Sequence, residues 1–105
     1  MKTILLLFCL VVNCFGIDAE RIADAVYRVE GGSKTKWPYG IKCHRHEPSV
    51  ARRMCIRTIE NCHADWMLDG KPGDFREYLA DRYVPPSVDA AGNRNWKRNI
   101  RKLLK

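Results

Sequence analysis

The longest regular pattern in the chain is a helical one that runs from Pro48 to Leu68. Apolar side chains recur there at the i, i+4, i+7 and i+11 spacing of one buried helix face, namely Cys55, Ile59, Cys62 and Trp66. Val50, Met54 and Met67 are expected to widen this stripe, and the charged side chains Arg52, Arg53, Arg57 and Glu60 to fall mainly on the other side. Proline fits the first helical turn, and the glycine at position 70 ends a helix at low cost. The pattern predicts one long helix over residues 48–68.

One shorter helix is predicted before this long helix and one after it. The first runs from about Asp18, a good N-cap residue, to Val29, and is followed by a pair of glycines. Its apolar side chains repeat at helical spacing, as Ile22, Val26 and Val29. Another runs from Asp74 to Tyr83 and is stopped by two prolines. Its inward-facing side chains are expected to be Phe75, Tyr78, Leu79 and Tyr83.

A fourth helix is expected to begin near Asn93 or Asn95 and to reach the end of the chain. It places Trp96, Ile100, Leu103 and Leu104 on one side and basic residues on the rest. The segment of residues 33–47 has no helical period, so it is irregular or at most a short hairpin. The segment of residues 84–95 is expected to be a second long loop, and long ordered loops are often functional. The fold class is therefore mainly α, a small domain of about four helices with two loops that can line a cleft.

The first residues have the pattern of a secretory signal peptide. Lys2 precedes a short apolar block, ILLLFCLVV, which is too short to span a bilayer comfortably, since roughly 20 residues are needed. Cleavage after Gly16 fits best, and the alternatives are cleavage after Ala19, an uncleaved anchor, or lipidation of Cys14. We therefore assign residues 1–16 to a signal peptide and residues 17–105 to one domain, exported to the periplasm or the extracellular space and without stable membrane insertion after cleavage.

The net charge predicts anionic partners. The whole chain has 19 Lys and Arg residues against 12 Asp and Glu residues. Loss of Lys2 leaves 18 basic residues, and 18 − 12 gives a net charge of +6 for residues 17–105. Such a charge favours anionic cell-wall polymers, lipid headgroups or nucleic acid. Export argues against nucleic acid.

Three cysteines remain after residue 16, and an oxidising compartment makes a disulfide possible. Cys55 and Cys62 are seven residues apart in a predicted helix, or roughly 10 Å, whereas a disulfide tolerates about 7 Å between Cα atoms. Cys43 can reach Cys55, while a bridge from Cys43 to Cys62 would be strained. The two readings that stay open are a Cys43–Cys55 disulfide and three buried thiols.

Glu30 is the first candidate for chemistry. It follows the helical run IADAVYRV directly and precedes two glycines, so it lies where a helix ends and a loop opens. A carboxylic acid that donates a proton near neutral pH must be held partly away from water, as a helix end beside apolar groups can provide. Two glycines leave room for a bulky substrate. The alternative is a solvated charge at a helix end.

The order of the motifs resembles the lysozyme-like superfamily, and within it the lytic transglycosylases. "AVYRVEGG" is followed by "GIKC", which begins ten residues after Glu30, and "ADRYVPPSVDAAGNRNW" resembles a later segment of small phage and bacterial members. The resemblance spans residues 19–104. It implies that Glu30 is the general acid and later the general base, that Gly40 and Ile41 form the floor of a glycan cleft, and that Tyr83 helps to position the substrate. The chain departs from the family at Gly31, Lys42 and Cys43, where the family commonly has Ser, Met and Gln.

The resemblance also implies the reaction, which is cleavage of peptidoglycan glycan strands between N-acetylmuramic acid and N-acetylglucosamine. A lytic transglycosylase forms a 1,6-anhydro sugar, whereas a retaining hydrolase needs a second carboxyl about 5 Å from the first. Asp24 lies on the same helix as Glu30 at the wrong spacing, and Glu47, Asp81 and Asp89 can approach only through the fold. This favours the transglycosylase.

Other side chains admit two interpretations. Trp37 and Tyr39 can stack on sugar faces or pack over the small core. The group of Cys43, His44, His46, Cys62 and His63 does not have the spacing of a structural zinc site, so no metal and no cofactor are expected. The basic last helix is most simply a solvated face that an anionic polymer attracts. The alternative function is a non-catalytic, secreted cationic module that binds cell wall or membrane.

Overall fold

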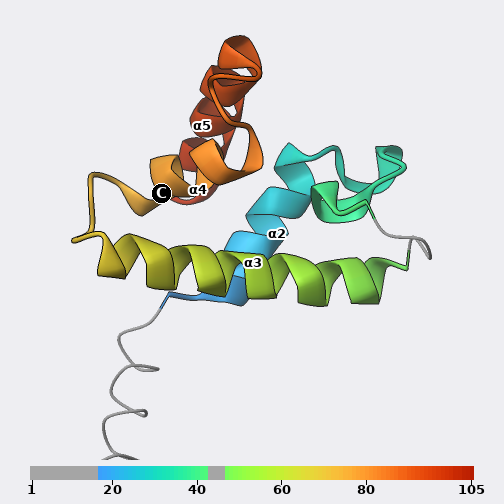
Figure 1. The fold of residues 1–105 in the computed structure, drawn as a ribbon. Coiled ribbons are helices and arrows are strands. Elements are labelled where there is room, and N and C mark those ends of the chain that lie inside the picture. The colour runs from blue at the N-terminus through green and yellow to red at the C-terminus, as the bar shows by residue number, and fades with distance from the viewer. Residues whose placement is uncertain (1–16, 43–46) are drawn as a thin grey trace, which may run out of the picture.

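Helix α3, Pro48–Leu68, is the longest element in a computed structural model that describes residues 17–42 and 47–105. Helices α2, Ala19–Val29, and α4, Phe75–Tyr83, both pack against α3, while α5, Ala90–Leu103, packs against α2 and α4 (Figure 1). The described residues form helices and no strand. The predicted mainly α class with four helices is confirmed.

The core lies where these helices meet. Its fully buried side chains include Val26 of α2, Leu79 of α4 and Ile100 of α5, and α3 adds the predicted stripe of Cys55, Ile59 and Cys62. The expected widening of that stripe is wrong at Met54 and Met67, whose exposed fractions are 44% and 47%. Each methionine is one residue from a stripe position and is therefore turned about 100° away from it. Ala51, four residues before Cys55, extends the buried face instead.

Helix α2 begins as the sequence predicts and is fastened to α3. The Asp18 carboxylate accepts a hydrogen bond from the Arg21 backbone N–H at 3.1 Å, which caps the helix. Arg52 of α3 forms an ion pair with Asp24 at 2.7 Å, although it was expected to face solvent. Gly31 ends α2 with a φ of 107°, in the left-handed region that glycine adopts at little cost.

The segment after α2 forms two short 3-10 helices, η1 (Gly32–Lys34) and η2 (Pro38–Gly40). Residues 31–42 contain no strand, so the short hairpin, one of the two forms expected for this segment, is absent from them. Element η2 packs against both α2 and α3, and it carries the buried side chain of Tyr39 into the core. The ring of Tyr39 lies 5.0 Å from that of Tyr27, centroid to centroid.

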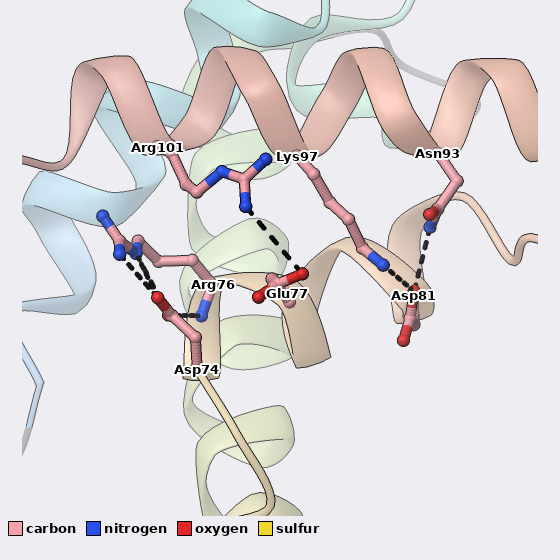
Figure 2. A network of polar contacts seen from close by, with 7 residues as sticks. All are labelled: Asp74, Arg76, Glu77, Asp81, Asn93, Lys97 and Arg101. Atoms are coloured by element: carbon pink, nitrogen blue, oxygen red, sulfur yellow. Dashed lines mark hydrogen bonds and ion pairs between the residues drawn. The ribbon is translucent and has the colours of Figure 1, made fainter.

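Helices α4 and α5 are joined by a seam of polar contacts (Figure 2). Lys97 and Arg101 of α5 pair with Asp81 and Glu77 of α4 at 3.1 and 3.9 Å, and the amide of Asn93 donates to Asp81 at 2.9 Å. The start of α5 differs from the expected Asn93 or Asn95. Asp89 caps the helix by accepting from the backbone N–H of residue 92 at 2.8 Å, so the helix begins at Ala90 and shortens the preceding loop.

Several predictions fall outside the described residues. The expected signal peptide of residues 1–16 lies there, and so does Cys43. Among residues 17–42 and 47–105, no helix combines the length and the apolar character needed to cross a membrane.

Candidate functional site

Glu30 lies at the C-terminal cap of α2, where the sequence places it, and its side chain is half-buried. The indole N–H of Trp96 donates a hydrogen bond to Glu30 Oε1 at 3.0 Å. Trp96 belongs to α5 and is 66 residues away in the chain. No described ion pair includes Glu30. The carboxyl group is therefore held at one oxygen by a neutral donor.

Gly40 lies directly against this carboxyl group. Its φ is 70°, and a Cβ atom added there would be 2.9 Å from Cδ of Glu30 and 3.1 Å from Oε2. Only glycine fits both the backbone conformation and the short distance. The structure thus brings together Glu30 and Gly40, two of the residues that the sequence assigns to the site.

Tyr83 joins the site through Trp96. Its ring stacks on the indole with centroids 5.2 Å apart and planes inclined by 19°. The Tyr83 hydroxyl and the Cys55 thiol share a hydrogen bond at 3.3 Å. Burial raises the pKa of the Tyr83 hydroxyl and the pKa of the Cys55 thiol, so both groups are neutral at pH 7. The stacking of the Tyr83 ring on the indole thus supports the position of the Trp96 N–H donor.

Tyr39 and Ile41 pack beneath the site. Tyr39 is only 7% exposed and has a φ of 62°, and its hydroxyl oxygen accepts from Arg52 at 3.3 Å. Ile41 is partly buried against the same core. Of the two interpretations given for Tyr39, packing over the core is what the structure shows. The other aromatic residue of this segment, Trp37, has the Lys36 ammonium 5.3 Å from the centre of its ring.

Three of the four acids considered as a second catalytic carboxyl have other contacts. Asp24 pairs with Arg52, Asp81 pairs with Lys97, and Asp89 caps α5. Glu47 is exposed at the N-terminal end of α3. The three aspartates are thus engaged in holding helices together or capping them.

The cysteines and the histidine in the described parts of the chain lie on α3 and form no metal site. Cys55 and Cys62 are both buried, and His63 packs against Trp66 and Phe75. Cys43, His44 and His46 lie outside the described residues, so the Cys43–Cys55 disulfide stays a prediction. Within residues 17–42 and 47–105, no three His, Cys, Asp or Glu side chains are grouped so that they can hold a metal ion.

Sequence reasoning did not assign Trp96 to the site. The sequence shows it as one apolar residue of an amphipathic helix, and a contact across 66 residues leaves no local pattern. The one available signal was that an indole N–H needs an acceptor when it is buried. Comparison with known proteins adds no further assignment, because no family model matches the chain and no curated protein or solved structure shows significant similarity to it.

Proposed function

We propose that this protein cleaves the glycan strands of peptidoglycan as a lytic transglycosylase, with Glu30 as its general acid and base. The observation that carries the proposal is the hydrogen bond from the Trp96 indole to Glu30 Oε1, made at the end of a helix and beside a glycine at which an added Cβ would force the carboxyl group to move. A solvated helix-end carboxylate needs neither feature. The resemblance of the surrounding motifs to lytic transglycosylases supplies the substrate and the reaction.

The arrangement suits proton transfer by one carboxyl group. Oε1 is held by the indole donor, so the transferable proton resides on Oε2. Glu30 donates this proton to the glycosidic oxygen as the bond from C1 of N-acetylmuramic acid breaks. The 6-hydroxyl oxygen of the same sugar attacks C1, and its proton passes to the Glu30 carboxylate. The products are a 1,6-anhydro sugar and a free 4-hydroxyl on N-acetylglucosamine, no water is consumed, and Glu30 ends protonated as it began.

The contacts of the other acids support a transglycosylase over a retaining hydrolase. A retaining hydrolase needs a free second carboxylate about 5 Å from the acid. Asp24 and Asp81 each form an ion pair, and Asp89 caps a helix. The transglycosylase route needs no such group, because the substrate supplies its own nucleophile.

Export forms part of the proposal, since the substrate lies outside the cytoplasm. Removal of residues 1–16 keeps Asp18, which caps α2 and so helps to fix the helix that ends at Glu30. Cleavage after Ala19 would remove that cap. The cap thus supports cleavage after Gly16 over cleavage after Ala19.

The test is a digest of purified sacculi by the protein and by Glu30→Gln, with the soluble products identified by mass spectrometry. We expect anhydro-muropeptides from the wild type and a rate about 10²–10⁴-fold lower from the variant, the range that a general acid contributes. Products with a reducing end would indicate a hydrolase instead. Sacculi that are bound but left intact by both proteins would indicate the alternative, a non-catalytic cationic module that binds the cell wall.

A further inference from the structure

A small groove separates the C-terminal halves of α2 and α5. Its volume is about 270 Å³, and its lining consists of Arg28, Val29, Asn99, Lys102 and Leu103. Ligand pockets for molecules of drug size usually exceed about 300 Å³. The groove is therefore suited to one side chain or short segment of a ligand.

The groove presents two cations that the fold does not neutralise. Among the described residues, no ion pair includes Arg28 or Lys102, and no acid lines the groove. The other side of α5 is different, because Lys97 and Arg101 are matched there by acids of α4 (Figure 2). A guanidinium group and an ammonium group that face one groove favour an anion, and a guanidinium can bind a carboxylate through two hydrogen bonds.

The groove adjoins the proposed catalytic acid. Val29 lines it, and Glu30 is the next residue. Lys102 is six residues beyond Trp96 on α5, which corresponds to about 9 Å along the helix. An extended peptide of two to three residues covers that distance. An anion bound at Lys102 is thus a few residues away from a group bound at Glu30.

We propose that this groove binds a carboxylate of the acidic peptide stem carried by N-acetylmuramic acid, and that it selects glycan strands that bear such stems. The proposal rests on the function proposed above, because the sugar cleaved at Glu30 is the one that carries the stem. Arg28 and Lys102 bind the carboxylate, Asn99 offers a carboxamide to the peptide backbone, and Val29 and Leu103 contact the aliphatic part of the stem.

A second cationic groove provides a matched control. It has a volume of about 240 Å³ and is lined by Val50, Arg53, Met54 and Arg57 of α3. It has the same combination of two cations and two apolar side chains, but it lies on a helix with which α5 makes no described contact. If charge alone attracted the substrate, both grooves would contribute equally.

The experiment measures binding of the Glu30→Gln protein, which does not consume its ligand, to glycan strands with intact stems and to strands from which an amidase has removed the stems. Two double variants are compared in this background, Arg28→Gln with Lys102→Gln and Arg53→Gln with Arg57→Gln. We expect the first pair to weaken binding to stem-bearing strands by about tenfold, because the lost contacts are hydrogen bonds to a charged group. It should weaken binding to bare strands only by the small factor that the loss of any two positive charges causes. The second pair should weaken binding to both kinds of strand by one small, common factor.

A further arm keeps the groove residues intact and changes the ligand. Strands whose stem carboxylates have been converted to amides should bind the Glu30→Gln protein as weakly as bare strands do. Equal binding of stem-bearing, amidated and bare strands would overturn the proposal, and so would equal effects of the two double variants.

The outcome is separable from that of the proposed function. Cleavage by the wild type with no discrimination between stems would leave the function standing and reject the groove. Discrimination between stems without any cleavage would reject the function and retain the groove as a binding site for acidic stems.

Discussion

The two sides of α5 use their charges differently. Toward α4, Lys97 and Arg101 meet Asp81 and Glu77, so the charges of this seam are balanced within the fold (Figure 2). Toward α2, Glu30 has an indole N–H as its partner, and the neighbouring Arg28 and Lys102 belong to no described ion pair. One helix therefore carries a closed seam on one side and an open junction on the other.

The charges on the α4 side stabilise the packing of two helices, whereas the charges on the α2 side are available to bind a ligand. Exposed ion pairs contribute at most about 1 kcal/mol each, so the seam is expected to tolerate substitution. The junction contains a half-buried carboxyl group, a glycine in contact with it and two cations that belong to no ion pair among the described residues. Substitutions there are expected to affect activity more than stability.

After the loss of Glu30 itself, the largest effect is expected from Gly40→Ala. The new Cβ would lie 2.9 Å from Cδ of Glu30 and would also have to accept a φ of 70°. The carboxyl group must move, so activity on sacculi should fall by tenfold or more and the free energy of unfolding by about 1–3 kcal/mol. Denaturant titration and a muropeptide release assay measure the two quantities.

Gly73→Ala is the matched control for this prediction. Gly73 has a similar φ of 66° with no atom within 4 Å of the added Cβ. It should share the backbone cost of about 1 kcal/mol and keep its activity. A Gly40→Ala protein that is as active as Gly73→Ala would show that the contact with Glu30 is not needed.

A smaller effect is expected from Trp96→Phe. The substitution keeps an aromatic ring against Tyr83 and removes the N–H that holds Glu30 Oε1. Loss of one hydrogen bond to a neutral carboxyl group costs about 0.5–1.5 kcal/mol, which would appear mainly as a lower kcat because the acid is less well placed. Trp66→Phe removes an indole N–H as well, from a bond to the Pro72 carbonyl oxygen, and should leave kcat unchanged. Similar kcat values for the two variants would contradict the role of Trp96.

The pH dependence of stability gives a test on α4. Hydrogen bonds from Arg76 lower the pKa of the Asp74 carboxyl group below its ordinary value of about 3.9. The folded state thus gains stability from this group above about pH 4, and the gain is lost as the pH falls through the lowered value. Asp74→Asn should reduce stability at pH 7 by about 1 kcal/mol and lessen the loss between pH 4 and pH 2 that the wild type shows in thermal unfolding. Parallel acid profiles of the two proteins would contradict this account.

The smallest effect is expected from Lys97→Met in the seam. Its ion pair with Asp81 is partly exposed, so its loss should cost less than about 1 kcal/mol and should matter less at high salt. Chemical denaturation at low and high ionic strength measures this. A loss of activity in Lys97→Met would show that the two sides of α5 are not independent.

The elements of the fold could largely be predicted from the sequence, because their ends carry strong local signals. Pro48 and Asp74 mark two helix starts, and the expected bounds of α3 agree with those observed. The start of α5 was missed because a glycine two residues inside the helix resembles a loop residue, while the Asp89 cap that allows it was overlooked. The helix ends could be predicted wherever both the capping residue and the residues that follow it were considered.

The site could be predicted only in part. Glu30 and Gly40 stand out because one ends a helix and the other allows close approach. Trp96 and the groove cations could not be found in this way, because their roles depend on how α5 lies against α2. Arg52 shows the same limit, since the residue expected in solvent pairs with Asp24 and contacts Tyr39 across 28 and 13 residues of sequence.

The most direct test of the account compares one isosteric change on each side of α5. The rate of muropeptide release from sacculi and the free energy of unfolding are measured for the wild type, Glu30→Gln and Asp81→Asn. We predict that Glu30→Gln loses its activity and keeps its stability, whereas Asp81→Asn keeps the wild-type rate and loses about 1 kcal/mol of stability. A Glu30→Gln protein that still releases anhydro-muropeptides at the wild-type rate would contradict the assignment of Glu30 as the acid.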